Sequence, residues 1–379
     1  MKIDSSALET IRRHLDVTMY AAIDLRISLE LEPSLTGFPK FDSLQLVVKR
    51  LDPGPETTFR LLRLGEVVED DAFRAAFPED VVSALLATEL VTATDGGWRT
   101  PGLVLVPAQG LLLLAGTPSA YPTAPGFPLA WFDLSTSFVA STLPGRLDGE
   151  RVLDVCSGTG VQALLCATRG AREVVGVELG AEAVMVAGAN AVLNGLADRV
   201  EFRCSDMLGA LGANERFDFV VANLPYAPVI RGDACPDTVA GLGNSVLWPL
   251  LEELPAHLSP AARGVLATWR SIGHDGSSYQ LDAVVERLGG AGCAVSANLD
   301  PAFDTVDGVL RMLHRDLGQR PDVPSARQET LVDEVRALIE SSALPVDGFY
   351  NQLIRFDRLP AGTVPPVPAV FGLARPSTE

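Results

Sequence analysis

The stretch that decides the fold is Arg151 to Tyr226, which contains RVLDVCSGTG (151–160), VVGVELG (174–180), VEFRCSDM (200–207) and FDFVVANLPY (217–226). Each short apolar run ends in a polar or glycine-rich turn, and helix-like sequence fills the gaps between the runs. This alternation predicts a parallel sheet with crossover helices, in which ligands bind at the carboxyl ends of the strands. The four turns are therefore the first place to expect functional residues.

The composition of the 379-residue chain is that of an ordinary globular protein, with 47% hydrophobic and 21% charged residues. The length predicts two domains, or one large domain with additions. The five cysteines are odd in number and lack C-x-x-C spacing, which favours a reduced, cytoplasmic protein without a structural metal. No apolar run is long enough to cross a bilayer and the first residues do not open a signal peptide, so no membrane partner is expected.

The formal charge of the chain is -18. Proteins that bind nucleic acid use basic surfaces to neutralise phosphates, so this acidic balance disfavours DNA or RNA as a partner. It fits a neutral or cationic small-molecule substrate better. Solubility alone accounts for the charge equally well.

The first 120 residues predict a helical region that ends in a β-ribbon. Asp95-Gly96-Gly97 marks a hairpin turn, and the apolar runs around Gln109-Gly110 predict two further strands. Three helices followed by a ribbon are similar to a winged helix, but the third helix, at 78–90, contains no Lys or Arg. A structural or substrate-covering role is therefore favoured over DNA recognition. The expected elements are helices at 5–18, 21–32, 57–64, 69–77 and 78–90, a short element at 42–50, a linker at 52–55, and strands at 103–106 and 111–115.

The remaining elements alternate between strand and helix, as a crossover sheet requires. A helix that ends near Pro144-Gly145 precedes the first core strand, either as a lid over a bound cofactor or as a packing helix. The expected strands are 151–155, 174–178, 200–204, 217–222 and 263–269, with 293–299 and 309–314 as a closing antiparallel pair and 348–356 as a last strand. The expected helices are 161–169, 181–193, 244–258, 278–289 and 325–342, and the tail from Pro360 is expected to be coil.

The turn after the first core strand carries Ser157, Gly158 and Gly160, and its glycines let the backbone approach a ligand closely. The glycine spacing alone also matches a dinucleotide fingerprint. Asp154, near the end of the same strand, separates the two readings, because a carboxylate repels a pyrophosphate and attracts an ammonium group. S-adenosylmethionine carries an ammonium and a sulfonium and no phosphate, so we expect it as the cofactor.

Acidic residues also end or follow the next two strands. Glu178 ends the second strand, where a carboxylate accepts hydrogen bonds from ribose hydroxyls, with Leu179 beside it. Asp206 follows the third strand, where its carboxylate can accept from the exocyclic amine of adenine. Met207 is expected to pack on the adenine ring or to offer its backbone N–H. With the glycine turn, these residues predict one S-adenosylmethionine site.

The turn after the fourth strand, Asn223-Leu224-Pro225-Tyr226, is the predicted catalytic element. Methyl transfer is an in-line displacement, so the enzyme must hold a nucleophile behind the methyl group. A planar nitrogen attacks poorly, because its lone pair is delocalised, unless its N–H groups are polarised. The Asn223 amide oxygen and the Leu224 carbonyl, held extended by Pro225, can each accept one N–H, and Tyr226 can stack on the planar group. A plain strand-end turn with a buried tyrosine is the competing interpretation.

On these motifs, residues 130–315 resemble class I S-adenosylmethionine-dependent methyltransferases, particularly the branch that methylates planar nitrogens. LDVCSGTG resembles the glycine loop of that branch, VGVELGAEAVMVAGANAVLNG its second strand and helix, and FDFVVANLPYAP its catalytic strand. The branch includes the release-factor glutamine methyltransferases and the small-domain ribosomal RNA methyltransferases, which share an N-P-P-Y-type motif. In this chain Leu224 replaces the first proline, which is expected to loosen the constraint on Asn223.

The resemblance implies an α/β fold with a Rossmann-like, seven-stranded methyltransferase sheet. The residues themselves predict the N-terminal helical, winged-helix-like domain, which does not look like the small helical domain of the glutamine enzymes. The expected domains are 1–120, the N-terminal domain; 121–320, the methyltransferase domain; and 321–379, an extension that packs on the catalytic domain. No metal is expected. The predicted catalytic residues are Asn223, Pro225 and Tyr226, and the predicted cofactor-binding residues are Asp154, Ser157, Gly158, Gly160, Glu178, Leu179, Asp206, Met207 and Asn223.

Two methyltransferase hypotheses follow. The first is an N-methyltransferase for a planar amide, amine or guanidine nitrogen of a small molecule, such as an amino-acid derivative of secondary metabolism, with arginine as a candidate. The second is a methyltransferase that acts on ribosomal RNA, DNA or a protein glutamine. Two hypotheses from different classes are a cofactor-binding module without catalysis and an NAD-dependent reductase, and Asp154 argues against the reductase. A homodimer is left open as the oligomeric state.

Overall fold

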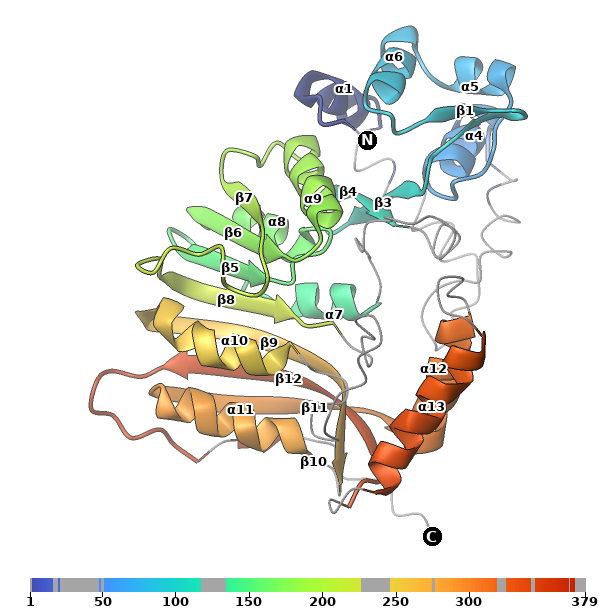
Figure 1. The fold of residues 1–379 in the computed structure, drawn as a ribbon. Coiled ribbons are helices and arrows are strands. Elements are labelled where there is room, and N and C mark those ends of the chain that lie inside the picture. The colour runs from blue at the N-terminus through green and yellow to red at the C-terminus, as the bar shows by residue number, and fades with distance from the viewer. Residues whose placement is uncertain are drawn as a thin grey trace. The chain divides into compact units, whose positions relative to one another are not determined.

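The structure is a computed structural model that describes residues 2–15, 20, 48, 51–116, 134–225, 246–274, 277–318, 325–341, 345–367 and 369–371 (Figure 1). The chain packs into two compact units. The first unit comprises Met1–Ser141, Ser157–Thr168 and Glu178–Cys204, and the second comprises Thr142–Cys156, Arg169–Val177 and Ser205–Glu379. The division into domains at 1–120, 121–320 and 321–379 stays a prediction.

The helices and strands largely follow the predicted elements. The N-terminal elements are α1 (Ser5–Leu15), α4 (Pro53–Leu62), α5 (Asp70–Ala76), α6 (Glu79–Ala87), β1 (Thr92–Thr94), β2 (Gly97–Arg99), β3 (Leu103–Ala108), β4 (Leu111–Gly116) and α7 (Leu134–Thr142). The central elements are β5 (Arg151–Val155), α8 (Val161–Thr168), β6 (Glu173–Glu178), α9 (Ala181–Leu193), β7 (Val200–Cys204) and β8 (Phe217–Asn223). The C-terminal elements are α10 (Leu247–Glu253), the 3-10 helix η2 (Leu254–His257), β9 (Leu258–His274), β10 (Ser277–Ser278), α11 (Tyr279–Gly290), β11 (Cys293–Thr305), α12 (Val306–Gly318), α13 (Ser325–Glu340), β12 (Gly348–Arg358) and β13 (Ala369–Phe371).

One sheet has the strand order β13-β11-β12-β9-β8-β5-β6-β7, with β10 paired to β9. The pairs β5–β6, β5–β8 and β8–β9 are parallel, whereas β12 is antiparallel to both of its neighbours, β9 and β11. Seven of these strands form the Rossmann-like sheet that the sequence predicts, and β10 and β13 are short additions. Because the chain winds away from β5 in both directions, the carboxyl end of β5 is a topological switch point, where such sheets bind ligands.

The second unit has a core of apolar residues from β5, β6, β8, β9 and β11 and from the helices α10 and α11. These two helices contact each other and lie on one face of the sheet (Figure 1). In β8, the run from Phe219 to Ala222 is fully buried, as expected for a parallel strand that is covered on both faces. Asn223, the next residue, is the last of β8 and begins the turn that is predicted to be catalytic.

The first unit has its own core, which joins the N-terminal helices to β3, β4 and α9. Leu8, Ile11 and Leu15 of α1 are buried, with the spacing of one helix face. Helix α9 contacts both α1 and β4. The crossover helix that follows β6 therefore belongs to the same compact unit as the N-terminal ribbon.

Three expectations about secondary structure are wrong. The linker at 52–55 is the beginning of α4, because Asp52 stands at its N-cap and proline is tolerated in the first helical turn. The segment 309–314, predicted as a strand, is part of α12. The apolar residues of α12 recur with a helical period, and a segment of six residues is too short to reveal it. In the tail, Ala369–Phe371 forms β13 and pairs with β11, although proline content predicted coil.

The antiparallel partner of β11 is β12, which lies between β11 and β9. The predicted helix at 21–32 and most of the element at 42–50 lie outside the described residues. None of the helices in the described part of the chain is long and apolar enough to span a membrane.

Candidate functional site

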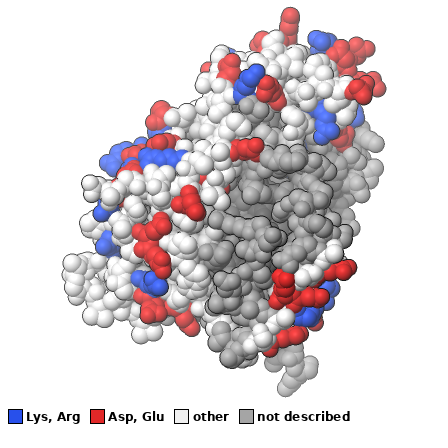
Figure 2. All heavy atoms as spheres, viewed as in Figure 1, with Lys and Arg blue, Asp and Glu red and all other residues white. Residues whose placement is uncertain are grey.

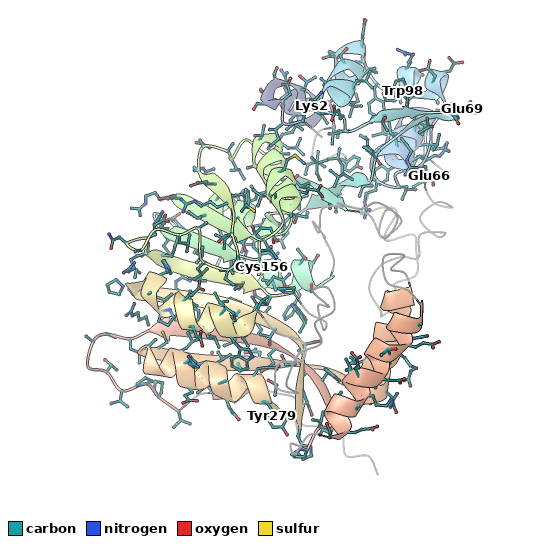
Figure 3. The ribbon with its side chains drawn as sticks, in the orientation of Figure 1. Lys2, Glu66, Glu69, Trp98, Cys156 and Tyr279 are labelled. Atoms are coloured by element: carbon teal, nitrogen blue, oxygen red, sulfur yellow. The ribbon has the colours of Figure 1, made fainter. Side chains whose placement is uncertain are left out.

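The glycine turn follows β5 and begins after Cys156, which is labelled in Figure 3. The Gly160 N–H donates to the Ser157 carbonyl at 2.7 Å, and Gly158 and Gly160 have positive φ angles of 51° and 78°. A Cβ at Gly160 would lie 2.4 Å from the Phe202 ring and 3.1 Å from the Ala187 side chain. Glycine is therefore required at 160 for both the backbone conformation and the available space.

Glu178, the last residue of β6, holds this turn. Its Oε2 accepts the Gly158 N–H and its Oε1 accepts the Gly180 N–H, both at 3.1 Å. Each carboxylate oxygen keeps further lone-pair capacity, so ribose hydroxyls can still donate to Glu178 as predicted. Leu179, the next residue, is 49% exposed, which is unusual for a leucine and leaves its apolar side chain available to a ligand.

Asp154 is 1% exposed and lies in β5, in register with Gly176 of β6 and Val221 of β8. In the poorly polarisable interior, the attraction between its carboxylate and a cationic group would be screened little. The register also pairs Val155 with Ala222, so β5 and β8 end at the same edge of the sheet. Asp154 and Asn223 thus approach this edge on neighbouring strands.

The turn that carries Asp206 and Met207 is well ordered. Ser205 Oγ donates to the Met207 carbonyl at 2.8 Å and accepts the Ala210 N–H at 2.9 Å. Met207 has a positive φ of 48°, and its side chain packs against the apolar core of the second unit. Asp206 is exposed, so its carboxylate is free to meet a ligand from solvent.

The turn that is predicted to be catalytic begins where β8 ends, at Asn223, whose partner in register is Ala267 of β9. The Leu224 N–H donates to the Ala267 carbonyl at 3.2 Å, which extends the ladder by one bond. A proline at 224 has no N–H and could not make this bond. The loss of the first proline is therefore offset by a hydrogen bond, and Leu224 itself is buried. Pro225 is exposed, and Tyr226 lies outside the described residues.

Trp269 of β9 contacts this turn, and the sequence did not point it out. Its indole Nε1–H donates to the Asn223 Oδ1 at 2.8 Å. Trp269 follows Ala267 by two residues in β9, at an irregularity in the pairing of β9 with β12. The bond orients the Asn223 amide and leaves its oxygen a second lone pair for a substrate N–H.

A second residue that the sequence did not point out is Asn190 of α9, whose side chain donates to the Thr159 carbonyl in the glycine turn at 2.9 Å. As for metals, the described residues contain no group of three or more His, Cys, Asp or Glu side chains that could hold an ion.

Known proteins resemble this chain in the same region. Residues 123–234 match the family described as Methyltransferase small domain. A ribosomal protein L11 methyltransferase of Geobacter sulfurreducens is 30% identical over 241 residues, which are 59% of this chain and 76% of that protein. A ribosomal protein uL3 glutamine methyltransferase of Bradyrhizobium diazoefficiens is 33% identical over 122 residues, which are 29% of this chain and 38% of that protein. A tRNA1(Val) (adenine(37)-N6)-methyltransferase of an Enterobacter species is 40% identical over 80 residues, which are 20% of this chain and 33% of that protein.

The chain covers more than two thirds of the Geobacter protein and less than half of the other two. All three are methyltransferases, and their names give different acceptors. The chain belongs to the class I S-adenosylmethionine-dependent methyltransferases, and its cofactor is S-adenosylmethionine.

Proposed function

We propose that this enzyme transfers the methyl group to a nitrogen of a protein, with the planar amide of a side chain as the favoured acceptor. The observation that carries the proposal is the turn after β8. There the Asn223 amide is oriented by Trp269, and the Leu224 backbone is held by Ala267. Two oxygens of this turn, Asn223 Oδ1 and the Leu224 carbonyl, suit the two N–H groups of a primary amide.

S-adenosylmethionine, when bound, supplies an electrophilic methyl group and leaves as a thioether. The residues of the turn bind and orient the acceptor. Hydrogen bonds to Asn223 and Leu224 place negative oxygens beside the N–H groups and stabilise the positive charge that develops on the nitrogen. The acceptor nitrogen gains one methyl group and loses one proton, which departs on the side of these oxygens. Fixed acceptors of this kind act mainly by positioning.

We propose that the residues at the strand ends each bind a different part of S-adenosylmethionine. Asp154 attracts the ammonium group, Glu178 accepts from the ribose hydroxyls, and Asp206 accepts from the adenine amine. Ser157, Gly158, Gly160, Leu179 and Met207 complete this site through backbone approach and apolar contact. The hydrogen bonds of Glu178 to Gly158 and Gly180 support the proposal, because they preorganise the turn.

A protein acceptor has more support than the small-molecule acceptor that the sequence favours. Two of the relatives are named for ribosomal proteins, and one of these names specifies glutamine, whose side chain ends in a planar amide. The net charge of -18 suits a basic polypeptide as well as it suits a small cation. Proteins that bind ribosomal RNA are basic, because they neutralise phosphates.

Transfer RNA is a second candidate, favoured by the adenine methyltransferase among the relatives. The charges count against it. Helix α6, at the position of a recognition helix, begins with Glu79 and Asp80 and contains no basic residue. On the face drawn in Figure 2, basic side chains of the described residues are interspersed with acidic ones and form no continuous stripe. Binding of RNA uses such a stripe.

An acceptor screen tests the proposal. The purified enzyme is incubated with methyl-labelled S-adenosylmethionine and, separately, with undermethylated ribosomal proteins, tRNA, and a panel of small amides and guanidines. We expect label in a ribosomal protein, located on a side-chain nitrogen by tandem mass spectrometry. Label in tRNA or in a small molecule, with none in protein, overturns the proposed acceptor class.

A further inference from the structure

We propose that Asn190 is a positioning residue that couples the N-terminal ribbon, β3 and β4, to the glycine turn, so that the ribbon contributes to cofactor affinity. All groups involved belong to the first unit. The inference rests on the proposed role of the glycine turn in cofactor binding.

The outer edge of β4 is closed by two asparagine side chains of α9. In the ribbon, Leu112 lies opposite Pro107, which has no N–H, so the polar groups of Leu112 point away from β3. Asn194 Oδ1 accepts the Leu112 N–H at 3.0 Å, and Asn194 Nδ2 donates to the Leu112 carbonyl at 2.8 Å. Asn190 repeats the pattern at Leu114, with distances of 2.7 Å and 3.0 Å. The two amides thus replace a neighbouring strand and protect the edge.

The geometry of the two elements explains why asparagines four residues apart fit strand residues two apart. Four residues of α-helix rise about 6.0 Å, at 1.5 Å per residue. Two residues of a strand rise about 6.7 Å. The two repeats nearly coincide, so Asn190 and Asn194, on one face of α9, meet Leu114 and Leu112, respectively.

The second hydrogen of the Nδ2 group has a different partner in each of the two asparagines. The second N–H of Asn190 Nδ2 goes to the Thr159 carbonyl in the glycine turn, at 2.9 Å. The second N–H of Asn194 goes to the Asn190 carbonyl within α9, at 2.8 Å. Both donors and the acceptor of Asn190 are therefore in use, and its side chain is 0% exposed. Asn194 holds the ribbon alone, whereas Asn190 holds the ribbon and the turn together.

The turn is buried against α9 at this point. Thr159 is 1% exposed, and the next residue, Gly160, has Ala187 of α9 beside it. Without Asn190, the Thr159 carbonyl would remain buried without its partner, which is costly, and the turn would relax away from its present position. Because coupling is reciprocal, a cofactor that orders the turn should also stabilise the edge of β4.

The two asparagines provide a matched pair for the test. Asn190→Ala and Asn194→Ala each remove the bonds to one leucine of β4, so both should lower the melting temperature. Only Asn190→Ala should raise the dissociation constant of S-adenosylmethionine, by about tenfold, measured by isothermal titration calorimetry. An equal change in both variants, or no change in Asn190→Ala, overturns the coupling.

The variant Glu178→Ala distinguishes a failure of this inference from a failure of the proposed cofactor site. If Glu178→Ala weakens S-adenosylmethionine binding and Asn190→Ala does not, the glycine turn is the cofactor site and the coupling is wrong. If neither variant affects binding, the proposed site itself fails and the inference fails with it.

Hydrogen exchange of the unaltered protein gives a test that does not depend on the folding of a variant. Saturating S-adenosylmethionine should slow exchange in a peptide that covers 111–116, as well as in one that covers the glycine turn. Exchange in α5, at 70–76, should stay the same and serves as the control. Slower exchange in the turn with no change at 111–116 overturns the coupling.

Discussion

The turns after β5 and after β8 are held in different ways. The glycine turn, Ser157 to Gly160, is held by the side chains of Glu178 and Asn190, and the latter also holds the N-terminal ribbon. The turn at Asn223 is held by two groups of the neighbouring strand β9, the Ala267 carbonyl and the Trp269 indole. If the proposed roles of the two turns hold, cofactor affinity depends on side chains of the first unit, Glu178 and Asn190, whereas acceptor positioning depends on β9.

The largest expected effect separates the two turns by function. Asn223→Ala should lower kcat by about a hundredfold or more, because it removes an oxygen that stabilises developing charge. We propose that Asn223 acts on the acceptor and not, as the sequence predicts, on the cofactor as well, so the dissociation constant of S-adenosylmethionine should stay within about twofold. Asn298→Ala, at an exposed position of β11, is the control. Unchanged turnover in Asn223→Ala would remove the proposed role of this residue.

The next effect concerns the space at the glycine turn. Gly160 and Gly149 have similar φ angles, 78° and 76°, but a Cβ at Gly149 meets nothing within 4 Å. Gly149→Ala should therefore cost only the conformational strain, about 1–2 kcal/mol. Gly160→Ala should cost a further 1–3 kcal/mol, roughly, for displacing Phe202, and should weaken cofactor binding. Denaturant unfolding of both variants measures the difference. Equal losses in the free energy of unfolding would contradict the close approach of Gly160 to Phe202.

A smaller effect is expected at Trp269. Trp269→Phe keeps an aromatic ring and removes the N–H that orients Asn223, so kcat should fall by about tenfold with unchanged S-adenosylmethionine affinity. Trp248→Phe is the control, because Trp248 packs against the core of the same unit from α10. Equal kinetic losses in the two variants would show that the effect comes from packing and not from the hydrogen bond.

The smallest effect is a pH dependence in the first unit. Burial lowers the pKa of His14 on α1, against the opposing influence of Asp80. The unfolded chain therefore binds a proton more readily than the folded one, and stability should fall as the pH drops below about 6.5. The His14 ring is only partly buried, so its contribution is small. On lowering the pH, the melting temperature of His14→Phe should fall less than that of the unaltered protein, by no more than about 2 °C. If the melting temperature depends on pH in the same way in both proteins, His14 is not the cause of the pH dependence.

Much of the fold could be predicted because it depends on local pattern. The apolar runs that became β5, β6 and β8, each followed by a polar turn, identify strands without any knowledge of their neighbours. Pairing across the sheet could not be predicted in the same way. The position of β12 between β9 and β11 depends on contacts between segments far apart in the chain, and the helical period of α12 exceeds the window that predicted a strand.

The candidate site shows the same limit. Glycines and carboxylates at strand ends, such as Gly158 and Glu178, stand out in a sequence because close backbone approach and ribose binding call for those residue types. Asn190 and Trp269 have no such signature, since an asparagine on an apolar helix and a tryptophan in a strand usually only pack. Their importance arises from partners that only the folded chain brings within reach, Thr159 for Asn190 and Asn223 for Trp269.

The most direct test of the central claim is the identity of the atom that receives the methyl group. After transfer of a labelled methyl group, the product is split between mild alkali and acid hydrolysis. We expect the label to survive mild alkali and to appear after acid hydrolysis as methylamine, from an amide, or as an N-methyl amino acid, from an amine. Release of labelled methanol in mild alkali would show an oxygen acceptor and contradict the account of the turn at Asn223.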